Sequence, residues 1–112
     1  MQDDRLPTHL YVDAHLRKLT QNAIPYYIVQ KGAASSGTII LKITNPGEGC
    51  RVLQQQRNLD GEMGWMTLFK GETVEENEAD AYIQRATDRD PDLWVIDIEE
   101  RTLKNPFEGK EF

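Results

Sequence analysis

The stretch DRDPDLWVIDIEER, residues 88–101, decides how the fold is interpreted. Its centre, residues 93–98, is rich in β-branched and aromatic side chains, and acidic residues stand at both ends. Such a block is typical of a β-strand. Apolar residues occupy nearly every position of the block, so both faces of the strand, including the one that carries Trp94, are apolar. We therefore expect it to be covered on both sides, by a helix on one and by a tail, a loop or a partner on the other.

The same stretch partly matches a calcium-binding EF-hand loop. Asp88, Asp90 and Asp92 would take the first, third and fifth ligand positions, and Glu99 the twelfth. The sixth position, where the loop needs glycine for its sharp turn, is Leu93. A hydrophobic strand cannot coil around an ion. We therefore expect hydrated carboxylates at the ends of a strand and no metal site.

Two helices are predicted, one near each end of the chain. The first starts with Thr8 as N-cap, and the second starts with a capping box formed by Thr73 and Glu76. The second helix stops at Asp90, because Pro91 steers it away from helical dihedral angles. The expected buried stripes have helical spacing and consist of Val12, Leu16, Leu19 and Ala23 in the first helix and of Ala79, Tyr82, Ile83 and Ala86 in the second.

Four further strands are predicted between the helices. They are the blocks rich in β-branched and aromatic residues at 26–31, 38–44, 50–56 and 63–69. Their connections are short and carry glycine, proline or Asp-Gly turn residues. Such links are too short for parallel crossovers, so these strands are expected to form an antiparallel meander.

The resulting order, αββββαβ, predicts a single α+β domain over residues 1–101, with an antiparallel five-stranded sheet and both helices packed on one face. Apolar and polar residues mostly alternate in the second strand, with Ile40 as an exception, which indicates a sheet buried on one side only. The fifth strand should lie parallel to the fourth and pair antiparallel with the first, in the order 5-1-2-3-4. Residues 102–112 are expected to be a polar, mobile tail whose anchors would be Phe107 or Phe112.

Composition and charge exclude several classes of protein. The net charge is −6, distributed as +1 over residues 1–72 and −7 over residues 73–112, which disfavours nucleic acid as a partner unless the N-terminal cations gather on one face. No apolar run approaches the roughly 18 residues of a membrane span. Cys50 is the only cysteine, so neither an intrachain disulfide nor a cysteine-based zinc site is possible. We expect a soluble cytoplasmic protein.

No pattern specifies a reaction. His9 and His15 lie six residues apart and do not align on a helix, and no second ligand cluster accompanies them. Cys50 lacks a partner histidine in any nucleophile signature, and the GAASSG loop at 32–37 is neither a nucleophile elbow nor a phosphate-binding loop. The sequence therefore predicts no catalytic residues, no cofactor and no metal.

With these elements placed, the chain resembles a known family, the bacterial domain of unknown function 1491. Four segments carry the resemblance, of which the last is the most specific: RLPTHLYVDAHLRK at 5–18, GTIILKI at 37–43, DGEMGW at 60–65 and DAYIQRATDRDPDLWVIDIEER at 80–101. The resemblance implies a compact one-domain bacterial protein. It implies no activity and no site residues.

We therefore favour a non-enzymatic protein-interaction module. Its fourth strand contains the segment GWMTLF, which has no charge or proline to protect a sheet edge, so a homodimer or a strand-adding partner is expected there. The alternative is a ligand-binding protein or enzyme with a pocket between helix and sheet, which would use Tyr26, Tyr82, Trp94, Arg85 or Arg101. The candidate binding residues are Trp65, Met66, Leu68, Arg85, Trp94 and Arg101.

Overall fold

The computed structural model describes residues 6–112 and has the element order αββββαβ, as predicted. Two α-helices and a short 3-10 turn accompany five strands. In chain order these are α1 (Thr8–Gln21), β1 (Tyr26–Gln30), β2 (Ile39–Asn45), β3 (Gly49–Arg57), β4 (Met63–Thr67), η1 (Phe69–Gly71), α2 (Glu76–Arg89) and β5 (Trp94–Glu99).

The five strands form one mixed sheet in the order β1-β5-β2-β3-β4. β5 pairs antiparallel with β1 and parallel with β2, in a register that runs from Ile39 opposite Trp94 to Thr44 opposite Glu99. The prediction that the last strand pairs antiparallel with the first is confirmed. The prediction that it runs parallel to the fourth strand, β4, is confirmed as well. The order 5-1-2-3-4 and the fully antiparallel sheet are wrong, because β5 lies between β1 and β2, where both of its apolar faces can be covered.

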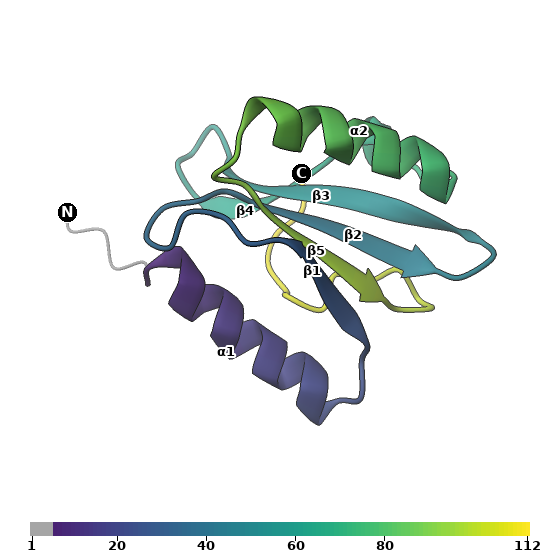
Figure 1. The fold of residues 1–112 in the computed structure, drawn as a ribbon, viewed down its shortest axis with the longest axis horizontal. Helices are drawn as coiled ribbons and strands as arrows, with labels where there is room; N and C mark the ends of the chain where they lie inside the picture. Colours follow the sequence, from purple (N-terminus) through teal and green to yellow (C-terminus); the bar gives the residue numbers. More distant parts are fainter. Residues whose placement is uncertain (1–5) are drawn as a thin grey trace.

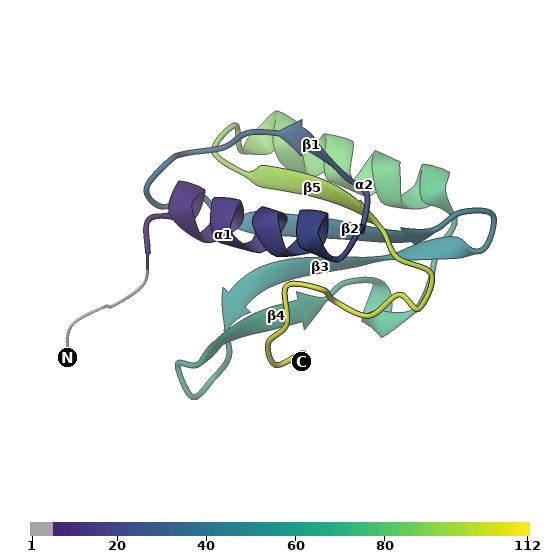
Figure 2. The ribbon, with the colours of Figure 1, turned by 90° about the horizontal axis from the view of Figure 1, so that it is seen from below.

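The two helices cover opposite faces of this sheet, so the prediction that both pack on one face is wrong (Figures 1 and 2). β2 is buried on both sides, and Ile40, which breaks its apolar alternation, faces α2. The core on the α1 face consists of Val12, Leu16, Leu19, Ile39, Leu41, Ile43, Leu53, Trp65, Trp94, Ile96, Ile98 and Phe107. The core on the α2 face consists of Ile40, Cys50, Val52, Ala79, Ile83, Ala86, Leu93 and Val95.

The ends of α1 differ from the prediction. Pro7, not Thr8, occupies the N-cap position, and the Thr8 hydroxyl donates a hydrogen bond to the Gly37 carbonyl at 3.1 Å. The threonine therefore joins α1 to the loop before β2 and does not cap the helix. Ala23 lies beyond the helix with a φ of 57° and is exposed, so it does not belong to the buried stripe.

The start of α2 also differs, since Glu75 is the N-cap residue and no side chain caps the helix. The predicted capping box of Thr73 and Glu76 is wrong because the preceding residue, Val74, is held in an extended bridge. The amides of Val74 and Cys50 each donate to the other's carbonyl at 2.9 Å. The predicted stop is confirmed, because Asp90 has extended dihedral angles and ends the helix.

Residues 102–112 run back across the α1 face and reach the outer edge of β4 (Figure 2). The Trp65 amide donates to the Lys110 carbonyl at 2.8 Å, and the Phe112 amide donates to the Trp65 carbonyl at 2.9 Å. Gly64 permits this approach, because a Cβ atom there would lie 2.5 Å from the Lys110 carbonyl oxygen. The edge formed by the segment GWMTLF is thus paired with the protein's own chain, and the prediction that it is open is wrong.

Phe107 anchors the same segment in the core. Its side chain is only 2% exposed, and its ring meets that of Trp65 edge to face, with the centroids 5.9 Å apart. His15 stacks on the same phenylalanine at a centroid distance of 4.8 Å. This packed position contrasts with the mobile tail that the composition of residues 102–112 suggests.

Replacing Phe107 with alanine tests whether the segment contributes to the fold. We expect Phe107→Ala to lower the free energy of unfolding by about 3 kcal/mol, as for other buried phenylalanines, in a urea titration. Phe112→Ala, which truncates a side chain that is 40% exposed, is the matched control and should cost less than about 1 kcal/mol. Equal, small losses for both variants would mean that the segment is not part of the folded domain.

Candidate functional site

A row of paired residues crosses the sheet on the α2 face. Tyr27 of β1 stands opposite Asp97 of β5, and Asp97 stands opposite Lys42 of β2. α2 lies over the β2 and β3 side of the sheet and leaves β1 uncovered on this face, so a groove of about 520 Å³ runs between α2 and β1. A second hollow of about 340 Å³ continues it past Asp97 towards Pro46.

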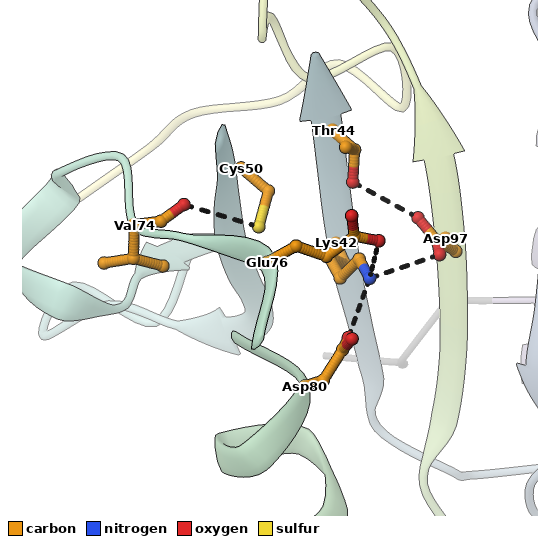
Figure 3. Close-up of polar contacts among 7 residues, drawn as sticks. All are labelled: Lys42, Thr44, Cys50, Val74, Glu76, Asp80 and Asp97. Atoms are coloured by element: carbon orange, nitrogen blue, oxygen red, sulfur yellow. Dashed lines mark hydrogen bonds and ion pairs between the residues drawn. The ribbon is translucent and has the colours of Figure 1, made fainter. Parts of the chain in front are cut away.

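Lys42 lies at the floor of the groove, surrounded by three carboxylates (Figure 3). Its Nζ atom lies 2.9 Å from Glu76 Oε2, 2.7 Å from Asp80 Oδ1 and 3.4 Å from Asp97 Oδ2. The lysine side chain is 5% exposed, whereas those of Glu76 and Asp80 are 57% exposed. The Thr44 hydroxyl donates a further hydrogen bond to Asp97 at 3.4 Å.

Burial and charge act on this cluster in opposite directions. Burial lowers the pKa of Lys42, but hydrogen bonds to Asp80 and Glu76 and the charge of Asp97 outweigh it, so the pKa is raised above its ordinary value. For Asp97 burial wins over the charge of Lys42, and its pKa is raised. The cluster therefore holds one fixed ammonium group and three carboxylates, with a formal charge of −2 when all are ionised.

This arrangement suits the binding of cations more than covalent chemistry. A lysine whose pKa is raised stays protonated and cannot act as a nucleophile. Cys50, on the neighbouring strand, is fully buried, and burial raises the pKa of its thiol, which donates to the Val74 carbonyl at 3.7 Å. Neither group therefore offers a reactive nucleophile.

The open side of the groove is the edge strand β1. Tyr27 is 69% exposed and Val29 is 51% exposed, and both line the groove. The Glu99 amide donates to the Pro25 carbonyl at 3.0 Å, so these two residues form a hydrogen-bonded pair. Hydrogen-bonded and non-hydrogen-bonded residue pairs alternate along two antiparallel strands, so the backbone N–H and C=O groups of Tyr26 and Ile28 point away from β5. Among residues 6–112, no segment pairs with that side of β1.

The six residues selected from the sequence do not converge on this groove. Trp65 and Trp94 lie in the α1-face core, where their indole N–H groups donate to the carbonyls of Glu108 and Ala33 at 2.9 and 2.8 Å. Met66 and Leu68 are partly buried near the other end of the sheet, and Arg85 and Arg101 are exposed. Of the two tyrosines considered with them, Tyr82 packs against Phe69, while Tyr26 borders the second hollow.

Sequence reasoning missed the Lys42 cluster. Its members come from β2, α2 and β5, and they are separated by up to 55 residues of chain. A signal was present, because Lys42 stands in the middle of GTIILKI, where a strand buried on both sides needs a partner for any charge. The alternation of that strand made the lysine look exposed.

Neither the histidines nor the acidic stretch forms a metal centre in the described part of the chain. His9 Nδ1 lies 3.0 Å from the Ala34 carbonyl, and His15 Nδ1 lies 2.9 Å from the Tyr11 carbonyl. Residues 94–99 are a strand, and within residues 6–112 no three or more His, Cys, Asp or Glu side chains are arranged so that they could hold a metal ion. The helices in this part of the chain are also too short or too polar to cross a bilayer.

Fold and groove together define a small α+β protein with a mixed sheet and an acidic cleft beside a free edge strand. The chain belongs to the family described as Protein of unknown function (DUF1491), whose model matches residues 6–108, and the resemblance predicted from the sequence is confirmed. No curated protein matches the chain.

Solved structures of three similar chains share this fold. A crystal structure of a DUF1491 family protein from Caulobacter crescentus CB15 has a TM-score of 0.84 and 29% identity, covering 96% of this chain and all of that chain. An NMR structure of a family member from the same organism has a TM-score of 0.81 and 30% identity over 96% of each chain. A solution structure of an A. tumefaciens protein, at 23% identity and a TM-score of 0.70 over 86% of each chain, shows the fold alone.

Lys42→Met tests the role of the cluster in stability. The pKa of Asp97 is raised in the folded state, so protonation of this carboxyl stabilises the folded protein. This stabilisation is present at low pH and is lost as the pH rises through the folded-state pKa of Asp97. Removing Lys42 leaves the partly exposed carboxylates of Glu76, Asp80 and Asp97 without their counter-ion, so it should cost about 2 kcal/mol near pH 7, where they are charged, and clearly less near pH 3. Urea unfolding at both pH values measures the difference.

The control for this variant is Lys110→Met, which removes an exposed pair with Glu62 at 3.3 Å. It should cost less than about 1 kcal/mol at either pH. A Lys42→Met loss that is as small as this, or that does not depend on pH, would contradict the electrostatic account of the cluster.

Proposed function

We propose that this protein is a non-enzymatic interaction module that binds a basic, extended segment of a partner protein along β1. The observation that carries the proposal is a free edge strand lying beside an acidic groove. The outward backbone groups of Tyr26 and Ile28 can hydrogen-bond to an added strand. The exposed rings and methyl groups of Tyr27 and Val29 supply apolar contact on the groove side.

Charge selects the kind of partner. Side chains of an added strand that point to the α2 face would enter the groove lined by Glu76, Asp80 and Asp97, where the formal charge of the cluster is −2. Lysine or arginine side chains complement this charge, and Tyr27 offers an aromatic face to the same cations. Two copies of this chain joined through β1 would bring two acidic grooves together. The groove therefore favours a different, basic protein over a homodimer.

β1 supports this function better than β4, the edge strand that the sequence suggested. β4 has the more apolar sequence, but its amides are already engaged by residues 110–112. β1 is uncharged from Tyr26 to Gln30 and has no proline within the strand, so two of the usual devices that block strand addition are absent. Its register shifts between Ile28 and Gln30, which leaves residues 26–28 as the regular part to which a partner strand can add.

Synthetic peptides test the proposal. A seven-residue peptide that alternates valine and lysine should shift the amide resonances of β1 and Asp97 in an NMR titration of the labelled protein, more weakly at high salt. A matched peptide that alternates valine and glutamate should bind at least about tenfold more weakly, since like charges meet in the groove. Equal binding of the two peptides, or shifts confined to β4, would refute the proposal.

A charge substitution on β1 tests the location. Val29→Lys places a cation beside the path of the basic peptide and should weaken its binding about tenfold or more, as measured by the same titration. Leu59→Lys introduces the same charge at a fully exposed position in the turn between β3 and β4, and it should leave binding unchanged. If both variants weaken binding equally, net charge and not β1 controls the interaction.

A further inference from the structure

A second candidate site lies on the opposite face of the sheet. A hollow of about 360 Å³ opens between the start of α1, the β3–β4 pair and residues 108–109. This volume is within the range of small-molecule pockets, which starts near 300 Å³. Its walls include Thr8, Tyr11, Gln55, Met63, Trp65 and Gly109.

The polar groups of this hollow fall into two sets. The Thr8 hydroxyl and the Trp65 indole N–H are already engaged, with the carbonyls of Gly37 and Glu108. Gln55 and Tyr11 form the second set: the Gln55 amide donates to the Tyr11 phenol oxygen, which leaves the Gln55 carbonyl oxygen and the Tyr11 O–H group for a ligand. Burial raises the pKa of Tyr11, and the hydrogen bond from Gln55 offsets only part of this increase. The phenol is therefore neutral, and its O–H group can donate a hydrogen bond to a ligand.

Gln55 owes its position to the strand register. It pairs with Trp65 across β3 and β4, so both side chains project to the α1 face, whereas its neighbour Gln54 projects to the α2 face. The half-buried side chains of Gln55 and Tyr11 therefore present one acceptor and one donor to the hollow. A ligand that fits them carries a donor and an acceptor side by side.

We infer that this hollow binds a small, uncharged, planar ring compound that carries a hydrogen-bond donor and acceptor on neighbouring atoms, as a lactam does. The half-buried ring of Tyr11 suits a flat ring, and the thioether of Met63 adds a favourable contact with it, while the buried Trp65 closes the base of the hollow. Among residues 6–112 the wall of the hollow offers no cation to an anionic ligand, since its ionisable groups there are Tyr11 and the carboxylate of Glu108.

The wall formed by residues 108–109 depends on glycine. Gly109 has a φ of 120°, and a Cβ atom there would lie 3.2 Å from the Trp65 indole, so the backbone can rest on that ring only when the side chain is absent. The packed C-terminal segment is thus a structural part of the hollow. The site is independent of the groove beside β1, which lies on the other face of the sheet.

Titration with 2-quinolone, a neutral fused-ring lactam, tests the inference in the intact protein. We expect it to shift the NMR resonances of Tyr11, Gln55 and the Trp65 indole N–H and to leave β1 unaffected. Quinoline has the same rings without the lactam N–H, and quinoline-2-carboxylate adds a negative charge. Both should bind at least about tenfold more weakly, because a polar group of the site is left unpaired or a charge is left uncompensated.

The variant Gln55→Leu locates the polar contact. It should weaken 2-quinolone binding about tenfold or more, whereas Gln54→Leu, on the other face of the same strand, should not change it. The comparison of the three probes on the unaltered protein decides the question even if Gln55→Leu folds poorly. Absence of shifts around the hollow at millimolar 2-quinolone, equal binding of all three probes, or equal effects of the two substitutions would overturn the inference.

Discussion

The insertion of β5 between β1 and β2 is the constraint on which the rest of the structure depends. β5 is apolar on both faces, and Trp94, Ile96 and Ile98 are buried towards α1 while Val95 is buried towards α2. A strand of this kind is stable only where both faces are covered. Its central position requires a helix on each face and displaces β1 to the edge of the sheet. Because β1 and β2 run in opposite directions, β5 must lie parallel to one of them, and it lies parallel to β2.

The second constraint is the charge of Lys42 in the adjacent strand. A buried ammonium group needs carboxylates, and they come from the first turns of α2 and from β5. This requirement ties the start of α2 to the middle of the sheet. Because α2 is held over β2 and β3, the face above β1 stays open, and the carboxylates of the cluster border that opening. The same interaction thus positions the helix and gives the groove its acidic character.

Most elements of the fold were predictable from local patterns, but their assembly was not. Periodicity located the helices and strands, and the two apolar faces of residues 93–98 predicted coverage on both sides. The opposite placement of the helices was missed because Lys42 and Thr44 resemble a solvated strand face until the distant Asp97 and Glu76 are placed beside them. The groove followed from strand order, which no local pattern encodes. The packing of residues 102–112 depends on one aromatic residue, Phe107, in an otherwise polar segment.

Amide hydrogen exchange along β1 tests the free edge, on which the proposed function rests, most directly. Since the Tyr27 backbone faces β5 while those of Tyr26 and Ile28 face outward, the account predicts slow exchange at Tyr27 and exchange at least about tenfold faster at the other two amides. Slow exchange at all three amides in the isolated protein would mean that this edge is already covered, and the proposed mode of binding would have to be abandoned.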